Sequence, residues 1–189
     1  TAPIPDPTTA PIPDPTTAPV PDPTTAPVPP PTAPPVTAPT GGGDWVEVYK
    51  DDFESDQGLF MGTNKRFEPI SFPDGNWSLR IKRTSQLKTS WIDIRDYSQL
   101  SFKFWMYATG MEVGDNFFFN VRFNGETAFT PVDEWVSGTD FSNREWLEQA
   151  VTIGVPAGKR KIQLQFKGDS DKGNDRVYID QVLLEGNPN

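Results

Sequence analysis

Aromatic and charged side chains alternate in Leu100–Ala108, whose sequence is LSFKFWMYA. On a β-strand, successive side chains point to opposite faces of the sheet. One set here is apolar and suits a core, whereas the other set comprises Lys103, Trp105 and Tyr107. Flat rings beside a hydrogen-bond donor suit a sugar, because the C–H face of the sugar stacks on the ring while its hydroxyls meet polar groups.

A second strand-like segment, Asn116–Phe123, has the same alternation and places Phe118, Asn120 and Arg122 on its non-core face. If the two segments pair, their non-core faces form one surface. Trp135, in the following PVDEWVSG segment, would then form a wall of the groove. The predicted ligand of this surface is a polysaccharide or glycan.

An alternative interpretation stays open for the same residues. β-strands favour aromatic side chains in any case, and a loop that covers this face would make Trp105 and Tyr107 part of a second core. Arg122 would then stack on Trp105 as a cation–π pair. The remaining tryptophans are assigned to core or loop packing; they are Trp45, Trp77, Trp91 and Trp146.

Two acidic clusters lie near opposite ends of the region from residue 44 onward. The first is DDFES, at 51–55, and the second is GDSDKGNDRVYID, at 168–180. The acids of the second cluster have the spacing of an EF-hand loop, but Asn174 stands where that loop needs glycine, and no helix is expected on either side. An EF-hand is therefore rejected. These acids are either calcium ligands or solvated turn residues.

The composition excludes several classes of function. The chain of 189 residues has 17 Lys plus Arg against 26 Asp plus Glu, no His and no Cys. Ser–His–Asp and Cys–His nucleophiles, the usual zinc sites and disulfides are therefore impossible. The net charge of −9 argues against nucleic acid, and the apolar runs are too short for membrane insertion.

A glycosidase would need two carboxylates on either side of a cleft. The acids near the predicted groove lie in turns, with no apolar pocket to raise a pKa. They are Glu112, Asp115, Glu126, Asp133 and Glu134. The chain is therefore expected not to be an enzyme.

The chain divides into two regions. Residues 1–43 repeat the unit TAPIPDPT and end in three glycines. Because proline fixes φ and lacks an N–H, this region predicts a disordered, polyproline-like stalk and a flexible joint. A spacer is favoured over a ligand for proline-recognising domains, because no Arg or Lys flanks the PxxP spacing. The chain begins within a repeat, so a processed protein or a fragment is expected.

Residues 44–189 contain every aromatic residue of the chain. Short strand-like runs, such as RKIQLQFK and RVYIDQVLL, alternate with Gly-, Asp-, Asn- and Pro-rich breaks, and no segment has a sustained helical period. This pattern predicts an all-β domain, an antiparallel β-sandwich.

With these strands placed, the domain resembles secreted jelly-roll modules of marine bacterial and algal surface proteins and hydrolases, related to carbohydrate-binding modules and MAM domains. The matching segments are DDFES, LSFKFWMYATGMEVGDNFFFNVRF, WVSGTDFSNREW and GNDRVYIDQVLLEG. The resemblance implies an extracellular or cell-surface location and a structural Ca²⁺ ion between Glu54 and Asp180. Asp52, Asp175 and a carbonyl of the PDGNW loop, such as that of Gly75, would complete the calcium shell.

The expected function is non-catalytic binding of carbohydrate by a calcium-stabilised module on a stalk. A structural or adhesive domain that contacts cell-wall or surface proteins, without a sugar pocket, is the alternative. Its acidity suits partners that are basic or bridged by calcium.

Overall fold

The structure is a computed structural model that describes residues 44–55, 58–62, 66–70 and 77–189. The predicted stalk, residues 1–43, and the predicted calcium ligand Gly75 lie outside the described residues. The described part contains twelve strands and no helix. The strands are β1 (Val46–Asp51), β2 (Phe60–Met61), β3 (Arg66–Glu68), β4 (Ser78–Lys82), β5 (Gln86–Thr89), β6 (Ile92–Asp93), β7 (Tyr97–Thr109), β8 (Asn116–Phe123), β9 (Thr130–Val136), β10 (Trp146–Gly154), β11 (Lys161–Asp169) and β12 (Arg176–Pro188).

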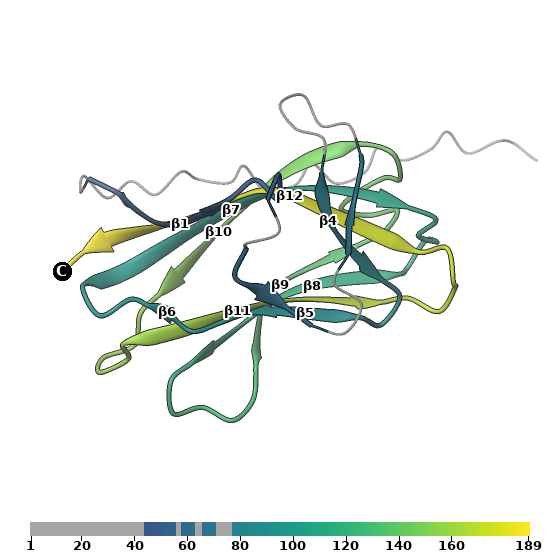
Figure 1. The fold of residues 1–189 in the computed structure, drawn as a ribbon. Coiled ribbons are helices and arrows are strands. Elements are labelled where there is room, and N and C mark those ends of the chain that lie inside the picture. Colours follow the sequence, from purple (N-terminus) through teal and green to yellow (C-terminus); the bar gives the residue numbers. More distant parts are fainter. Residues whose placement is uncertain (1–43, 56–57, 63–65, 71–76) are drawn as a thin grey trace, which may run out of the picture. The chain divides into compact units, whose positions relative to one another are not determined.

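The strands form two antiparallel sheets that face each other as two layers (Figure 1). Sheet A has the order β10-β7-β12-β4-β3, and β1 also pairs with β12. Sheet B has the order β2-β5-β11-β8-β9, and β6 also pairs with β11. The all-β prediction and the jelly-roll sandwich are confirmed.

One predicted strand pairing is wrong. β7 lies between β10 and β12 in sheet A, whereas β8 lies between β11 and β9 in sheet B. The segment between β7 and β8, residues 110–115, crosses from one sheet to the other instead of forming a hairpin within one sheet. The apolar faces of β7 and β8 therefore meet across the core, where the rings of Phe102 and Phe119 stack with centroids 4.5 Å apart.

Phe166 of β11 lies at the centre of this core and is fully buried. Its ring contacts rings from β2, β7 and β8, which belong to both sheets, at centroid distances of 4.9–5.9 Å. These contacts follow from the alternation of apolar and polar residues in each strand, because the apolar members of each strand all point inward. The polar members consequently point outward from both sheets.

A bulge divides β12 into two halves. The pairing with β7 shifts register between Asp180 and Leu183, and Gln181 in the bulge has a positive φ of 49°. An extra residue in one strand re-aims the chain and increases its twist. The first half of β12 pairs with β4, and the second half pairs with β1. None of the described residues forms a helix that is long and apolar enough to cross a membrane.

Candidate functional site

The outer face of sheet B carries three of the predicted ligand-binding residues. Phe118, Asn120 and Arg122 alternate with core residues along β8 and point away from the core. The antiparallel register places polar residues of β11 directly opposite them. The pairs are Phe118 with Lys167, Asn120 with Gln165, and Arg122 with Gln163.

Hydrogen bonds join these residues into a row across three strands. The amide of Asn120 donates to Gln165 over 3.0 Å, and the amide of Gln165 donates to Gln86 of β5 over 3.1 Å. We call Asn120, Gln165 and Gln86 the amide row. Asn120 and Gln165 are 6% and 7% exposed. Their low exposure and mutual bonds fix the orientation of amide groups that would otherwise rotate freely.

Arg122 lies beside the amide row and between two aromatic rings. Its guanidinium donates to Gln163, whose own amide donates to the carbonyl of Thr89 over 2.9 Å. The Arg122 Cζ atom lies 5.2 Å from the ring centroid of Trp91 and 4.9 Å from that of Phe129. Cations at these distances are attracted to the ring faces. The rings and the guanidinium thus form one cluster at the edge of the amide row.

Trp91 had been assigned to packing from the sequence, but 41% of it is exposed. Trp77, assigned in the same way, is 42% exposed. Two other contributors that the sequence prediction missed are Phe129, which precedes β9, and the glutamines of β11. Their signal was present in KIQLQFK, where Gln163, Gln165 and Lys167 alternate with apolar residues. It was missed because β11 was not recognised as the partner of β8.

A hollow of about 440 Å³ adjoins the amide row on this face. It is lined by Met61, Gly62, Gln86, Lys88, Phe129 and Gln165. Amide groups supply both donors and acceptors, and the rim supplies apolar and aromatic surface. This arrangement can hold a neutral polyhydroxyl ligand without supplying an acid–base pair.

The other predicted ligand-binding residues of β7 lie on the outer face of sheet A. Lys103 forms a salt bridge with Glu185, with Nζ and Oε2 2.9 Å apart. The ring of Tyr107 lies 5.2 Å from that of Trp146, which is on β10, and Trp105 is partly buried. Because sheets A and B present these residues on opposite sides of the sandwich, the predicted single surface with Phe118, Asn120 and Arg122 does not form.

Trp135 also differs from its prediction. It belongs to β9 and is 6% exposed. Its ring contacts Phe104 and Phe117 at centroid distances of 5.5 and 5.8 Å. The side chain points inward because it is paired with the inward-facing Phe117. Trp135 is therefore a core residue and not the wall of a groove.

The predicted calcium ligands Glu54 and Asp180 accept hydrogen bonds from two adjacent residues at the start of β4. Oε1 of Glu54 accepts a hydrogen bond from the backbone N–H of Trp77 over 2.9 Å. Oδ2 of Asp180, which is buried, accepts one from the hydroxyl of the next residue, Ser78, also over 2.9 Å. The exposed Asp52 accepts a hydrogen bond from the backbone N–H of Glu54 over 3.2 Å.

Asp175, the remaining predicted calcium ligand that is described, lies elsewhere. It precedes Asp180 by five residues, and five residues of extended strand span about 16 Å. Asp175 instead gathers with Glu112 and Asp115, and one carboxylate oxygen from each lies within 4.8 Å of the others. This acidic cluster has a geometry that can hold a metal ion. Sequence reasoning had placed Glu112 and Asp115 only near the supposed sugar groove.

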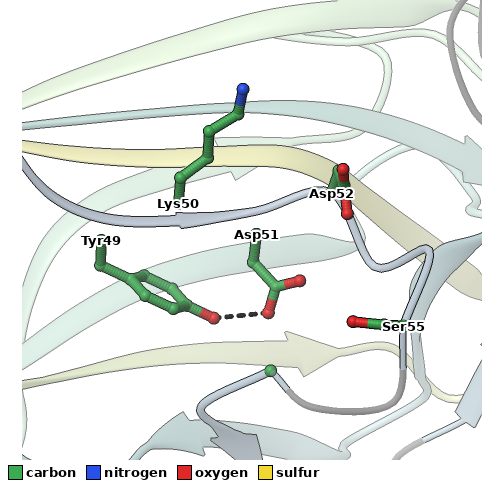
Figure 2. Close-up of a pocket in the computed structure, with 6 residues that line it drawn as sticks. Tyr49, Lys50, Asp51, Asp52 and Ser55 are labelled. Atoms are coloured by element: carbon green, nitrogen blue, oxygen red, sulfur yellow. Dashed lines mark hydrogen bonds between the residues drawn. The ribbon is translucent and has the colours of Figure 1, made fainter.

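A separate hollow of about 320 Å³ lies beside β1 (Figure 2). Tyr49 and Asp51 point to the same side of the strand, and the hydroxyl of Tyr49 donates to Asp51 over 2.5 Å. The second oxygen of Asp51 accepts a hydrogen bond from the backbone N–H of Phe53 over 2.9 Å. Burial, followed by the bond with Asp51, raises the pKa of Tyr49 above its ordinary value. These bonds shape the chain after β1.

Comparison with known proteins finds similarity at the level of structure. No family model matches the chain, and no curated protein matches it. The C-terminal family 22 carbohydrate-binding module of Xyn10B from Clostridium thermocellum is 12% identical and superposes with a TM-score of 0.59 over 75% of this chain and 94% of its own. The CBM22-1 xylan-binding domain of Xyn10C from Paenibacillus barcinonensis is also 12% identical, with a TM-score of 0.56 over 78% of this chain and 97% of its own.

An adhesin domain has a similar fold. The K3 cleaved adhesin domain of Lys-gingipain from Porphyromonas gingivalis is 14% identical, with a TM-score of 0.52 over 75% of this chain and 99% of its own. These similarities place the described domain among jelly-roll sandwiches with the fold of carbohydrate-binding modules.

Proposed function

We propose that the chain binds a polysaccharide, without hydrolysing it, on the outer face of sheet B. The observation that carries the proposal is the amide row of Asn120, Gln165 and Gln86 beside the Trp91–Arg122–Phe129 cluster. The amides would accept hydrogen bonds from sugar hydroxyls and donate hydrogen bonds to them. The exposed ring of Trp91 would stack on the apolar face of a sugar ring.

The face is prepared for such a ligand before it binds. The amides of the row are already held by one another, so binding would cost little side-chain entropy. Nε of Arg122 is buried and has no acceptor among the described residues. An N–H in this state is a donor that a ligand hydroxyl can satisfy, and an unsatisfied buried donor is costly to leave unpaired.

The structural comparisons support a sugar as the ligand. Two of the similar structures are xylan-binding domains, so xylan is the first polysaccharide to test. Amides and cations surround the proposed sugar site on the outer face of sheet B, whereas the described carboxylates of β9 and β11 on this face, Glu134 and Asp169, stand at the Asn116 end of β8. A glycosidase would need a pair of carboxylates across the ligand, and binding alone is the better proposal.

A structural Ca²⁺ ion held by Glu54 and Asp180 is part of this proposal. Both carboxylates bond to adjacent residues at the beginning of β4, which brings the segment after β1 and the strand β12 to one place. Carboxylate oxygens are hard ligands that suit calcium. Bound there, the ion would supply charge neutralisation and would tie β1 to β12 and β4. Asp52 would support Glu54 through its backbone N–H.

The remaining expectations stand as parts of the same proposal. A polysaccharide partner suits a secreted or cell-surface module. Residues 1–43 would act as a spacer between this module and a neighbouring structure, because repeated prolines keep a chain extended without a core.

A glycan array with the full 189-residue chain, in millimolar calcium, would test the sugar proposal. The variants Trp91→Ala and Phe129→Ala should not bind the polysaccharide that the unaltered chain binds. Circular dichroism should show that both variants remain folded. Trp146→Ala, which removes a tryptophan ring from the outer face of sheet A, serves as the matched control and should bind normally.

The result would contradict the proposal if Trp146→Ala lost binding and Trp91→Ala kept it. That outcome would move the binding surface to the outer face of sheet A. A blank array from a folded chain would favour the adhesive alternative, in which the Tyr107 and Trp146 rings contact a cell-wall or surface protein. The fold shared with an adhesin domain is the observation that keeps this alternative in the test.

A further inference from the structure

Three carboxylates meet where two connections between the sheets lie side by side. Glu112 and Asp115 belong to the segment between β7 and β8, which leads from sheet A to sheet B. Asp175 ends the segment between β11 and β12, which leads from sheet B back to sheet A. One oxygen from each carboxylate lies within 4.8 Å of the others. The chain thus concentrates negative charge where its two sheets are joined.

Asp175 is fully buried, yet one of its oxygens has no bonding partner among the described residues. Oδ2 accepts a hydrogen bond from the backbone N–H of Lys172 over 2.7 Å. Oδ1 is buried and accepts no hydrogen bond. A buried carboxylate oxygen that lacks a donor costs free energy, more than a neutral group would. The site therefore needs a positive group or a donor from outside the described chain.

Glu112 has the same deficit. Its Oε2 is buried and has no partner in the described part of the chain, whereas its Oε1 lies 2.5 Å from Nζ of Lys172. The Lys172 side chain is 55% exposed, so it approaches the cluster from the solvent side and offsets one of three negative charges. Two unpartnered oxygens and two uncompensated charges remain among Glu112, Asp115 and Asp175.

Asp115 completes the group and is itself held in place. Its Oδ2 accepts a hydrogen bond from the backbone N–H of Glu112 over 2.8 Å, and its backbone carbonyl accepts one from the N–H of Ser137 over 2.9 Å. Burial, followed by the negative charges of Asp175 and Glu112, raises the pKa of the Asp115 carboxyl above its ordinary value. The three carboxylates repel one another in the absence of a cation.

We propose that Glu112, Asp115 and Asp175 bind a divalent cation, Ca²⁺ in the first instance, which fastens the two connections together. Calcium takes six to eight oxygen ligands at about 2.3–2.6 Å, so ligands on opposite sides of the ion lie about 4.6–5.2 Å apart. Oxygens within 4.8 Å of one another fit this shell. The adjoining hollow of about 410 Å³, which Asp115 lines with Asp169 and Asp171, has room for the water that fills the remaining positions.

The ion would also affect the proposed sugar site, although its own binding does not depend on that proposal. β8 begins directly after Asp115, and β11 ends before the segment that carries Asp175. These two strands carry Asn120 and Gln165 of the amide row. Fastening their ends would fix the register that keeps these two amides within hydrogen-bonding distance. The site is separate from Glu54 and Asp180, about 16 Å further along β12.

Isothermal titration of the full chain, stripped with chelator and titrated with CaCl₂, would test the proposal by counting ions. The double variant Asp115→Asn/Asp175→Asn should bind one ion fewer per chain than the unaltered protein. Each amide keeps an oxygen to accept the backbone hydrogen bond, so the loops should retain their shape. Asp93→Asn, at an exposed carboxylate paired with Arg95, is the matched control and should bind as many ions as the unaltered chain.

Two further variants separate this site from the one at Glu54, and thermal melting adds a third test. Glu54→Gln should leave the ion at Asp175 in place, and Lys172→Met should tighten binding there several-fold, because the competing ammonium group is removed. The change in melting temperature caused by Asp115→Asn should reverse its sign with calcium. Relative to the unaltered chain, this variant should melt at a higher temperature in chelator and at a lower temperature in calcium.

An unchanged ion count in the double variant would overturn the proposal. So would a change in melting temperature of the same sign with and without calcium, because a carboxylate with a purely structural role would behave in that way. If the double variant loses a bound ion in titrations with MgCl₂ but not in titrations with CaCl₂, the assignment to calcium is wrong.

Discussion

Removal of the Phe166 ring should destabilise the domain more than almost any other single truncation. Phe166 is fully buried and contacts Phe60, Phe104 and Phe117, among other rings, at centroid distances of 4.9–5.9 Å. Phe→Ala in a core costs about 3–5 kcal/mol, and the cost depends on how far the surroundings can collapse. Here the surroundings come from both sheets and are fixed by strand pairing, so the cavity should persist.

The expected loss for Phe166→Ala is therefore about 4–5 kcal/mol, near the upper end of that range. Because whole domains are stable by roughly 5–15 kcal/mol, the variant should lose about a quarter or more of its stability. Its melting temperature should fall by roughly 8–20 °C, on the scale of about 2–4 °C per kcal/mol for a domain of this size.

Phe118→Ala is the matched control. Phe118 lies beside β11 in the same sheet as Phe166, but on the outer face and not on the core face. Phe118 pairs with Lys167, the neighbour of Phe166, and its ring lies 5.2 Å from Nζ of that lysine. A cation–π contact at the surface of the protein contributes about 0.5–1 kcal/mol. Urea unfolding followed by tryptophan fluorescence would give both free energies, provided that the m-values agree.

A cost below about 2 kcal/mol for Phe166→Ala would refute the reasoning, since it would fall below the whole range for buried phenylalanine. Equal costs for Phe166→Ala and Phe118→Ala would refute it as well, because the two faces of β8 and β11 would then be equivalent. Both outcomes would mean that the two sheets do not enclose the core described here.

Three other predictions follow from single contacts. Gly168→Ala should cost at least about 2 kcal/mol in urea unfolding, because its Cβ would lie 2.1 Å from the backbone oxygen of Arg83, whereas Gly154→Ala, which meets nothing within 4 Å, should be nearly neutral. Gln165→Leu should destabilise the fold by about 1–3 kcal/mol and weaken polysaccharide binding, since it deprives the Asn120 amide of its acceptor; unchanged binding would count against the amide row. The raised pKa of Tyr49 means that its contribution is complete below about pH 10 and is lost as the pH rises further, so the stability difference between the unaltered chain and Tyr49→Phe should shrink in alkaline urea titrations.

The sequence was sufficient to predict the strands and the direction of most side chains. Alternation along Asn116–Phe123 placed Phe117 inside and Phe118 outside, as the structure has them. The direction of a side chain can be predicted because successive residues of a strand point to opposite faces, and this alternation depends only on the local sequence. The all-β sandwich follows from the same local pattern repeated along the chain.

The sequence was not sufficient to predict which strands are neighbours. Two strands that are joined by a short loop can either pair with each other as a hairpin or face each other across a core. Both arrangements bury the same apolar residues. Residues 110–115 take the second course, so Trp105 and Asn120 lie on opposite sides of the sandwich. For the same reason, Asp175 lies beside Asp115 from a distant part of the sequence and not beside Asp180.

The pairing of β1 with the last half of β12 has a mechanical consequence. Val46 lies opposite Gly186, so both strands reach the same end of the sheet (Figure 1). Tension applied between residues 45 and 188 would load their hydrogen bonds one after another, as in a zipper, and not all at once in shear. Under load, β1 would peel from β12, while the pairing of β12 with β7 on its other side would hold β12 in the sheet. A calcium ion held by Glu54 would lie just beyond the last bond to open and would set where the peeling stops.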